Sequence, residues 1–501
     1  MRLGDGTMCV DSGFRFDADD FSFANWGRSQ RADSNVTVQT LVDLFGHDAI
    51  CAPGAKDTCI VRPRATQVLE EWNNALSGGR CEGFAALGAR FFLGMEDPAA
   101  YRTGAGRVSQ LTRRDGDLDK ALVYWWATQF LPEVAGRAAQ SRNDAPLVLV
   151  DQLIVGLANK LGYTIGLYDQ GSGHAVLPFA GTMRGESFVI HVYDNNHPGE
   201  RREIIVSPDN TWVYENAVRD VSNNWVTWRG STGTLELTPM SARRGPFRCP
   251  FCLDEASAPL TISLASRDPD TPGALRVTTR DGSITVDSNG ITNSIAGATW
   301  TVGKGARLGY VSVTVPASTT DVDVVVFRSH STIPAGDVVV TARRGDAPHI
   351  QVQGDLARAV SDAQARPILQ IRDADTTVSS PSDAPARVTV AGKDGMSQMT
   401  LARGDDLTIR RRGVHEIEIA LKGSTANDST RVRLTDVSTI HELSARNGTL
   451  ITRELRQSPI DVRLPRALPF SATTRDHVSP TTTATESPTD SAPSIVVTLP
   501  D

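Results

Sequence analysis

The spacing of apolar residues changes near residue 160, from the period of helices to the alternation of strands. Upstream, apolar positions recur with helical spacing, which predicts helices over 63–76, 81–94, 118–131 and 146–161. Downstream, apolar and polar residues alternate, which predicts strands over 164–168, 174–179, 187–193, 203–207, 212–215 and 234–237. Helices first and strands afterwards indicate an α+β domain, which we place at residues 46–255.

The second half of the chain is predicted to be rich in β-structure. Strands separated by Asp-Gly, Asn-Gly and Arg-Gly turns are expected at 275–279, 283–287, 310–316, 323–327, 337–342 and 349–352. This spacing indicates a β-sandwich-like domain over residues 259–353. A helix at 356–365 and strands at 386–390, 397–401, 407–410, 416–421 and 430–434 predict a second β-rich domain over 354–468. Residues 469–501 are rich in Thr, Ser and Pro, which predicts a disordered tail.

Cys81 is the most informative residue of the α+β region. It follows the glycine turn Gly78-Gly79 and opens an apolar-periodic helix in which Phe84 and Phe91 share its face. A helix N-terminus favours thiolate over thiol, because free N–H groups and the positive end of the helix dipole lie there. The two glycines allow a sharp turn that leaves the sulfur uncrowded. Cys81 is therefore a candidate nucleophile.

An imidazole and a carboxylate follow in the order that a thiol nucleophile needs. His174 opens the predicted strand 174–179, and Asp194 directly follows the strand 187–193. If the two strands are neighbours, the carboxylate can bind the imidazole nitrogen that faces away from the thiol. Asn195 and Asn196 are rival third members, and we favour Asp194 because it ends the strand directly.

Two further histidines lie close to these residues in the sequence. His191 lies in the middle of a predicted strand and His197 lies in a turn. Neither has the small-residue context of His174, so both are expected to be structural or solvent-exposed.

The glycine-preceded cysteine that opens a helix, the later Gly-His-Ala-Val strand and the acidic strand end resemble the papain-like cysteine hydrolase superfamily. The resemblance implies a papain-like catalytic domain, a helical layer packed on an antiparallel sheet. It implies Cys81 as nucleophile, His174 as general base and acid, and Asp194 as the residue that orients the imidazole. The superfamily's glutamine upstream of the cysteine is absent here, where Ala75 stands, and Asn74 is the candidate oxyanion donor. The implied activity is cleavage of peptide or amide bonds in a polypeptide or peptide-like substrate through a Cys81 thioester, without a cofactor.

Two other functional classes fit parts of the sequence. A transglutaminase-like acyltransferase uses the same order of cysteine, histidine and aspartate but passes the acyl group to an amine. A binding protein is the other alternative, in which the β-domains bind a surface or a protein partner and the cysteine domain is degenerate. The intact Cys81, His174 and Asp194 favour an enzyme.

Residues 1–45 are predicted to be an N-terminal extended segment packed on the catalytic domain. Aromatic residues recur from Phe14 to Trp26 among acidic and small ones, which is typical of an extended stretch. An ordinary edge strand accounts for this pattern better than an inhibitory pro-segment does.

The remaining cysteines allow two interpretations. Cys51 and Cys59 can close a loop as a disulfide, with the Cys249-Pro-Phe-Cys252 motif forming a separate local turn. Alternatively, Cys51, Cys59, Cys249 and Cys252 form a zinc site, although the first pair is more widely spaced than zinc knuckles usually are. We favour the disulfide and expect no resident metal.

Composition limits the possible partners. The 501 residues carry a net charge of −7 and show no basic stripe, which argues against nucleic acid as a partner. The longest apolar stretch, 147–161, is interrupted by polar residues, so no membrane span is expected. The first residues lack the apolar core of a signal peptide, and export or a cell-envelope location stays open. All candidate catalytic residues precede residue 255, so a fragment 1–255 is expected to fold alone.

Overall fold

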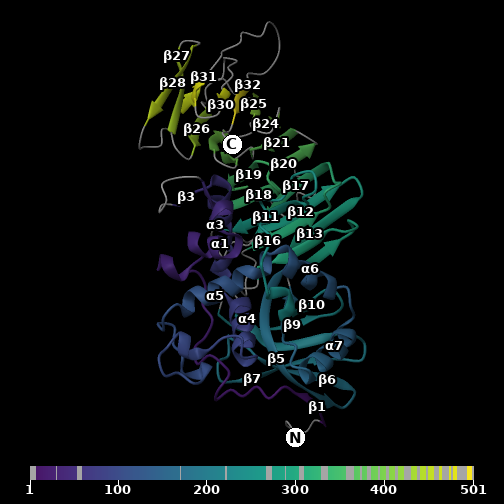
Figure 1. Ribbon diagram of the computed structural model, residues 1–501. Helices are drawn as coiled ribbons and strands as arrows, with labels where there is room; N and C mark the ends of the chain where they lie inside the picture. The colour runs from purple at the N-terminus through teal and green to yellow at the C-terminus, as the bar shows by residue number, and fades with distance from the viewer. Residues whose placement is uncertain are drawn as a thin grey trace. The chain divides into compact units, whose positions relative to one another are not determined.

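The computed structural model shows a chain that forms two compact units (Figure 1). Unit 1 comprises Met1–Phe45, Trp72–Arg248 and Thr299–Tyr310, and unit 2 comprises Gly46–Glu71, Cys249–Ala298 and Val311–Asp501. The structure describes residues 7–29, 31–52, 59–169, 171–219, 223–266, 273–287, 289–303, 310–328, 337–356, 366–372, 375–380, 385–392, 395–401, 406–411, 416–422, 430–436, 440–446, 449–455, 462–464, 473–475, 478–481 and 494–498.

Unit 1 contains an antiparallel sheet with the strand order β10-β4-β5-β6-β7-β8-β9, and β1 also pairs with β5. The long strand β5 pairs with β4 along its first half and with β1 along its second half. The Arg229 amide donates to Asp169 Oδ2 (3.2 Å), so the end of β9 lies beside the end of β4. The strands are β1 (Thr7–Asp11), β4 (Tyr163–Asp169), β5 (Ser172–Arg184), β6 (Ser187–Tyr193), β7 (Arg201–Val206), β8 (Trp212–Arg219), β9 (Trp225–Gly230) and β10 (Leu235–Pro239).

The helices of unit 1 are α1 (Val38–Phe45), α4 (Cys81–Phe92), α5 (Leu118–Ala127), α6 (Pro132–Ser141) and α7 (Pro146–Ala158). Helix α3 (Pro63–Ala75) begins in unit 2 and ends in unit 1. Both α6 and α7 begin with proline, whose fixed φ suits the first helical position. Short 3-10 helices span Ala32–Ser34, Leu76–Gly78, Pro98–Ala100, Val108–Gln110, Thr128–Phe130 and Met240–Arg243.

Two hydrophobic cores lie on opposite faces of the unit 1 sheet. Along β5, Ala175 and Leu177 belong to the core of helix α4, whereas Val176 belongs to the core of helix α7. This alternation follows from the two-residue period of a strand. Helix α4 is buried along almost its whole length, so its first residue is held beside the sheet.

Unit 1 includes a segment distant in sequence, which carries strand β15 (Thr299–Val302). The backbone oxygen of Trp300 accepts a hydrogen bond from Arg142 (2.7 Å), and its ring lies 4.8 Å from that of Tyr168. The ring of Tyr310 lies 5.1 Å from that of Phe130. These contacts join the segment to the helices and to β4.

Unit 2 contains two long antiparallel sheets (Figure 1). The first sheet includes the strand order β16-β11-β18-β19-β22-β23-β26-β27-β28, and β29 pairs with β26. Its strands are β11 (Leu260–Ser266), β16 (Tyr310–Val315), β18 (Val338–Arg344), β19 (His349–Gly354), β22 (Ala386–Ala391), β23 (Gly395–Leu401), β26 (Thr430–Asp436), β27 (Ile440–Arg446), β28 (Thr449–Leu455) and β29 (Val462–Leu464). The second sheet has the strand order β14-β13-β12-β17-β20-β21-β24-β25-β32. Its strands are β12 (Gly273–Thr279), β13 (Gly282–Asp287), β14 (Gly290–Asn293), β17 (Asp321–Arg328), β20 (Leu369–Arg372), β21 (Asp375–Ser379), β24 (Asp406–Arg411), β25 (Glu416–Lys422) and β32 (Ser494–Thr498). Unit 2 also holds α2 (His47–Ile50) and the strand pairs β2 (Cys51–Ala52) with β3 (Ile60–Val61) and β30 (Thr473–Arg475) with β31 (Val478–Thr481).

The mixture of helices and antiparallel sheets agrees with the predicted α+β class. The domain limits differ from those expected, because both long sheets continue across residue 354, with β19 paired to β22 and β17 paired to β20. The residues 46–71 of the expected catalytic domain belong to unit 2. The predicted helix 356–365 lies outside the described residues from 357 on, and the segment 469–501 contributes β30, β31 and β32 where it is described.

Among the described residues, no helix is both long and apolar enough to span a membrane.

Candidate active site

Cys81 is the first residue of helix α4 and is completely buried. The turn before it needs glycine at position 79, where φ is 123°, a conformation that residues with a side chain rarely adopt. Cys81 is not part of a disulfide. The sequence thus places the thiol at a helix N-terminus inside unit 1, as its pattern predicts.

Strand register brings His174 to Asp194. Strands β5 and β6 pair with Leu177 opposite Tyr193. Continuing this register toward the start of β5 places His174 opposite Asn196 and diagonal to Asp194. Diagonal neighbours on adjacent antiparallel strands are close enough for side-chain contact.

The three predicted catalytic residues meet in one buried cluster. His174 Nε2 lies 2.9 Å from Asp194 Oδ1, and both side chains are fully buried. The other imidazole nitrogen, Nδ1, has no hydrogen-bond partner of standard geometry within the described chain. Cys81 nevertheless interacts with this imidazole. Because Asp194 contacts Nε2, Nδ1 is the imidazole nitrogen that is available to the thiol. Hydrogen bonds of this kind are often long without substrate and tighten when substrate binds.

The electrostatics of the cluster favour a charged imidazole. Burial alone would lower the pKa of His174, but the Asp194 carboxylate and the interaction with Cys81 raise this pKa to about 10. Burial would likewise raise the pKa of Asp194, but His174, Tyr214 and the Asn196 amide together lower it. At neutral pH the pair is an imidazolium beside a carboxylate.

Tyr214 is a member of the cluster that the sequence analysis does not identify. Its hydroxyl donates a hydrogen bond to Asp194 Oδ2, while the Asn196 amide donates to Oδ1 (2.7 Å). Tyr214 lies in β8 and is fully buried. Burial and the Asp194 charge raise the pKa of its phenol well above the usual value, so the phenol keeps its proton. Each oxygen of the carboxylate thus has a fixed donor.

The two asparagines after Asp194 have different positions. Asn195 donates to the backbone oxygens of Cys81 (3.3 Å) and Ala175 (3.1 Å), so it ties the start of α4 to β5. Asn196 Nδ2 lies 3.5 Å from His174 Nε2, farther than Asp194 does. The geometry therefore favours Asp194 as the third member over both rivals.

A buried ion pair anchors Glu82, the residue after Cys81. The Glu82 carboxylate accepts a hydrogen bond from Arg243 and another from the Thr164 hydroxyl (3.2 Å). Glu82 and Arg243 are both fully buried. Since removing one partner of a buried ion pair leaves a costly uncompensated charge, the ion pair ties α4 to the 3-10 helix Met240–Arg243, and the Thr164 hydrogen bond ties α4 to β4.

The predicted oxyanion donor does not join the cluster. Asn74 lies near the end of α3, and its side chain forms no hydrogen bond with any described residue. A different asparagine, Asn25, accepts a hydrogen bond from the Arg80 amide (2.9 Å) and donates to Asn196 Oδ1 (3.3 Å). The sequence signal for Asn25 is its place at the end of the aromatic stretch, which by itself indicates no chemistry.

The imidazoles of His191 and His197 have hydrogen-bond partners other than Cys81, His174 and Asp194. His191 Nε2 is 3.0 Å from the Thr182 hydroxyl, and burial lowers the pKa of this imidazole despite nearby Glu203. His197 stacks on Trp225, with ring centroids 4.2 Å apart. Both contacts are structural.

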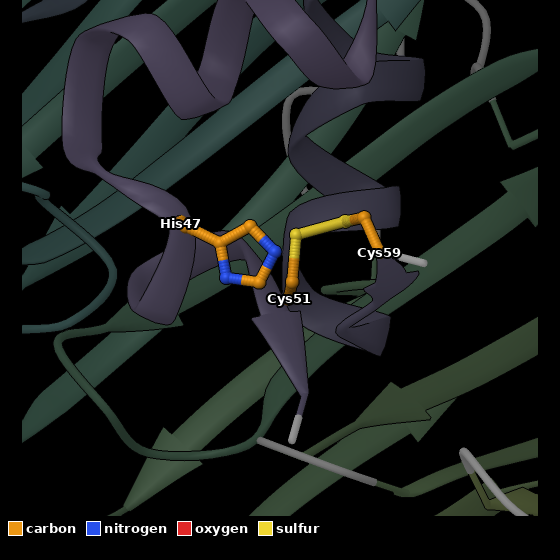
Figure 2. Close-up of side chains that lie close together, drawn as sticks. All are labelled: His47, Cys51 and Cys59. Carbon is orange, nitrogen blue, oxygen red and sulfur yellow. A yellow bond between two sulfur atoms is a disulfide. The ribbon is translucent and has the colours of Figure 1, made fainter. Parts of the chain in front are cut away.

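Four of the other five cysteines form disulfides, Cys51 with Cys59 and Cys249 with Cys252, and Cys9 is in no disulfide. The first pair agrees with the loop-closing alternative. Figure 2 shows His47 beside the Cys51–Cys59 bond, and the possible ligand atoms of these three residues lie within 4.8 Å of one another. Because zinc binds thiolates, sulfurs joined in disulfides do not provide the four-thiolate site of the alternative.

No family model, curated protein or solved structure matches this chain.

Proposed function

We propose that this chain is a papain-like cysteine hydrolase that cleaves peptide or amide bonds. The observation that carries the proposal is the buried array in which Cys81 meets His174, His174 meets Asp194, and Asp194 meets Tyr214. A thiol at a helix N-terminus beside an imidazole that a carboxylate orients is the arrangement of a cysteine nucleophile.

The array can support both halves of the reaction. The Cys81 thiolate attacks the carbonyl carbon, a C–S bond forms, and the carbonyl π electrons move to oxygen. When the carbonyl re-forms, the C–N bond breaks and the amine leaves with a proton from His174. Water then attacks the thioester, His174 takes a proton from that water, and the C–S bond breaks to return the thiolate and a carboxylic acid.

The electrostatics support this order of events. The raised pKa of His174 keeps the imidazole protonated at neutral pH, which is the form that donates to the leaving amine. Asp194 stays ionised because its pKa is lowered, so it can stabilise the imidazolium throughout. Tyr214 and the Asn196 amide hold the carboxylate in place.

Cys81, His174 and Asp194 are all inaccessible to solvent. A substrate therefore reaches the sulfur only when neighbouring residues move, as in enzymes that open and close around their substrates. The extended β-sheets of unit 2 fit a binding or positioning role toward a surface or protein partner, which we include in the proposal.

The test uses the full chain with Cys9→Ser, so that Cys81 is the only cysteine outside a disulfide. Cleavage of a proteome-derived peptide library is read by mass spectrometry, and a peptidyl vinyl sulfone reports covalent labelling of Cys81. We expect cleavage and labelling in this protein and neither in the matched Cys81→Ala variant. Equal cleavage by both proteins would contradict the proposal. Incorporation of a dansylated amine in place of hydrolysis would identify the acyltransferase instead.

A further inference from the structure

Asn25 connects the two sides of the proposed catalytic centre. Its side chain is bonded to the Arg80 amide, one residue before the nucleophile, and to Asn196, two residues after Asp194. Its backbone amide donates to the Asn195 oxygen (2.8 Å). The N-terminal segment therefore enters the site between the start of α4 and the end of β6.

We infer that Asn25 is the catalytic side-chain amide that stabilises the oxyanion formed when Cys81 attacks a carbonyl. This inference rests on the proposed hydrolase function. The superfamily's glutamine, expected a few residues before the cysteine, is missing from this chain. The inference gives its donor role to Asn25, which lies 56 positions before Cys81 in the sequence.

The contacts of Asn25 define which way its amide points. The Arg80 N–H can only donate, so the Asn25 atom that it binds is the oxygen Oδ1. The NH₂ group then faces the turn that carries Asn196 and donates one hydrogen to Asn196 Oδ1. An amide nitrogen carries two hydrogens, so a second donor remains for a substrate oxygen.

The segment that carries Asn25 is held rigidly. A Cβ added at Gly27 would lie 2.3 Å from the Ser77 oxygen, so only glycine allows this close approach to the turn before Cys81. The Arg80 guanidinium donates to the Gly27 oxygen (2.9 Å) and lies 4.3 Å from the Trp26 ring centroid.

Aromatic contacts add to this rigidity. The Trp26 ring also faces the Arg113 guanidinium at 3.8 Å and the Phe84 ring at 5.6 Å. Phe84 lies one helical turn after Cys81 in α4. A donor that is fixed before reaction needs no reorganisation when charge develops, which is what makes an oxyanion donor effective.

The assigned step is the formation of the tetrahedral intermediate. The thiolate forms a C–S bond, the carbonyl π electrons become a lone pair on oxygen, and Asn25 Nδ2 donates a hydrogen bond to that oxygen. No proton is transferred from Asn25. Its effect is therefore confined to reactions that pass through an oxyanion.

A reaction of Cys81 that forms no oxyanion can therefore serve as the control for one that does. In the Cys9→Ser background, Asn25→Ala and Asn25→Asp are compared with Asn74→Ala, a matched control at the sequence-based candidate. Each protein is tested for cleavage of the peptide library, for inhibition by a peptide aldehyde, which forms an oxyanion-like adduct, and for alkylation by iodoacetamide, which does not. Asn25→Asp keeps the acceptor for the Arg80 amide but removes the donor.

We expect both Asn25 variants to lose about 100-fold to 1000-fold in kcat and to bind the aldehyde more weakly. Alkylation of Cys81 should stay within about threefold of the parent rate. Asn74→Ala should match the parent in all three measurements. Full turnover in Asn25→Asp, or a loss of turnover in Asn74→Ala alone, would overturn the assignment while leaving the hydrolase proposal intact.

A second outcome separates the two proposals. If the parent protein cleaves no peptide and Cys81 is not labelled, the hydrolase function fails, and the role of Asn25 fails with it. If both Asn25 variants lose alkylation in the same proportion as turnover, the residue shapes the fold around Cys81 and is not an oxyanion donor.

Discussion

Two parts of the molecule place a histidine next to cysteine sulfur, and they differ in nearly everything else. In unit 1, Cys81 meets His174 in a fully buried site where Asp194 lies behind the imidazole. In unit 2, His47 lies beside the Cys51–Cys59 disulfide, but its side chain is 61 % exposed and neither sulfur is a thiol (Figure 2).

The difference shows that a cysteine sulfur close to an imidazole does not by itself provide the features of the proposed catalytic site. Burial strengthens the interaction between charges, so the Asp194 carboxylate acts strongly on His174. Near His47 the carboxylate is that of Asp48, 3.6 Å away and fully open to water, which screens its charge. An enclosed carboxylate and a cysteine outside any disulfide are what distinguish the proposed catalytic site.

The sharpest test of this comparison is to remove sulfur at each place. Cys81→Ala should reduce kcat to below about 1 % of the parent value, because loss of a covalent nucleophile costs several orders of magnitude. The double variant Cys51→Ser and Cys59→Ser should keep the parent kcat. Peptide-library cleavage at matched protein concentration measures both. Equal losses in the two variants would mean that the disulfide region takes part in catalysis.

A second test compares the loss of kcat when His174, Asp194, Asn196 or Tyr214 is substituted. His174→Ala should cost more than Asp194→Asn, since a carboxamide can still orient the imidazole but stabilises the imidazolium less well. Tyr214→Phe should cost about 10-fold in kcat, because it removes one hydrogen bond to a buried carboxylate. It should also move the acid limb of the pH profile upward. Inactive Asn196→Ala beside active Asp194→Asn would mean that the third member is misplaced.

A third test uses pH and a second buried histidine. The pKa of His174 is raised to about 10, against about 6.5 in an unfolded chain, so its stabilisation is fully present below pH 6.5 and lost as pH rises toward 10. The pKa of His191 is lowered, so its contribution is present above pH 6.5 and lost on acidification. Urea unfolding of His174→Gln and His191→Gln across pH should give free-energy differences with opposite trends. Parallel trends would contradict the ion pair.

The smallest expected effect concerns the exposed cluster. Opening the Cys51–Cys59 loop in the double serine variant should lower the free energy of unfolding by about 2 kcal/mol, because a short loop restricts the unfolded chain only modestly. His47→Ala should change neither stability nor turnover measurably. Thermal unfolding and library cleavage check both statements, and a marked loss of turnover in His47→Ala would show that this exposed histidine has a catalytic role.

Local patterns in the sequence predicted the helix that begins at Cys81 and the strand that ends next to Asp194, but few of the contacts between elements. Helix α4 and strand β6 begin at the predicted residues, because their periodicity is dense in apolar side chains. Helix α6 is missing from the prediction, since Val134 and Ala138 are its only buried apolar residues and give a weak signal. Strand β9 is also missing, because its alternation is interrupted by partly exposed positions.

The same limit applies to the site. Cys81, His174 and Asp194 lie at the ends of elements, so order and context bring them to attention. Tyr214 reaches Asp194 only through the pairing of β6, β7 and β8, and Asn25 only through the path of the N-terminal segment. Such contacts depend on long-range register, which no local period encodes.

Unit 1 is not contiguous in the chain, and this has a consequence for how the protein is made. The segment Thr299–Tyr310 belongs to unit 1, where Trp300 contacts Arg142 and Tyr168, yet it follows the first strands of unit 2. The expectation that a fragment 1–255 folds alone therefore omits part of unit 1. During translation, residue 310 must leave the ribosome before unit 1 can be completed, so a partly made chain lacks the contacts of Trp300 with Arg142 and Tyr168. Completion of unit 1 therefore waits until the first strands of unit 2 have been synthesised.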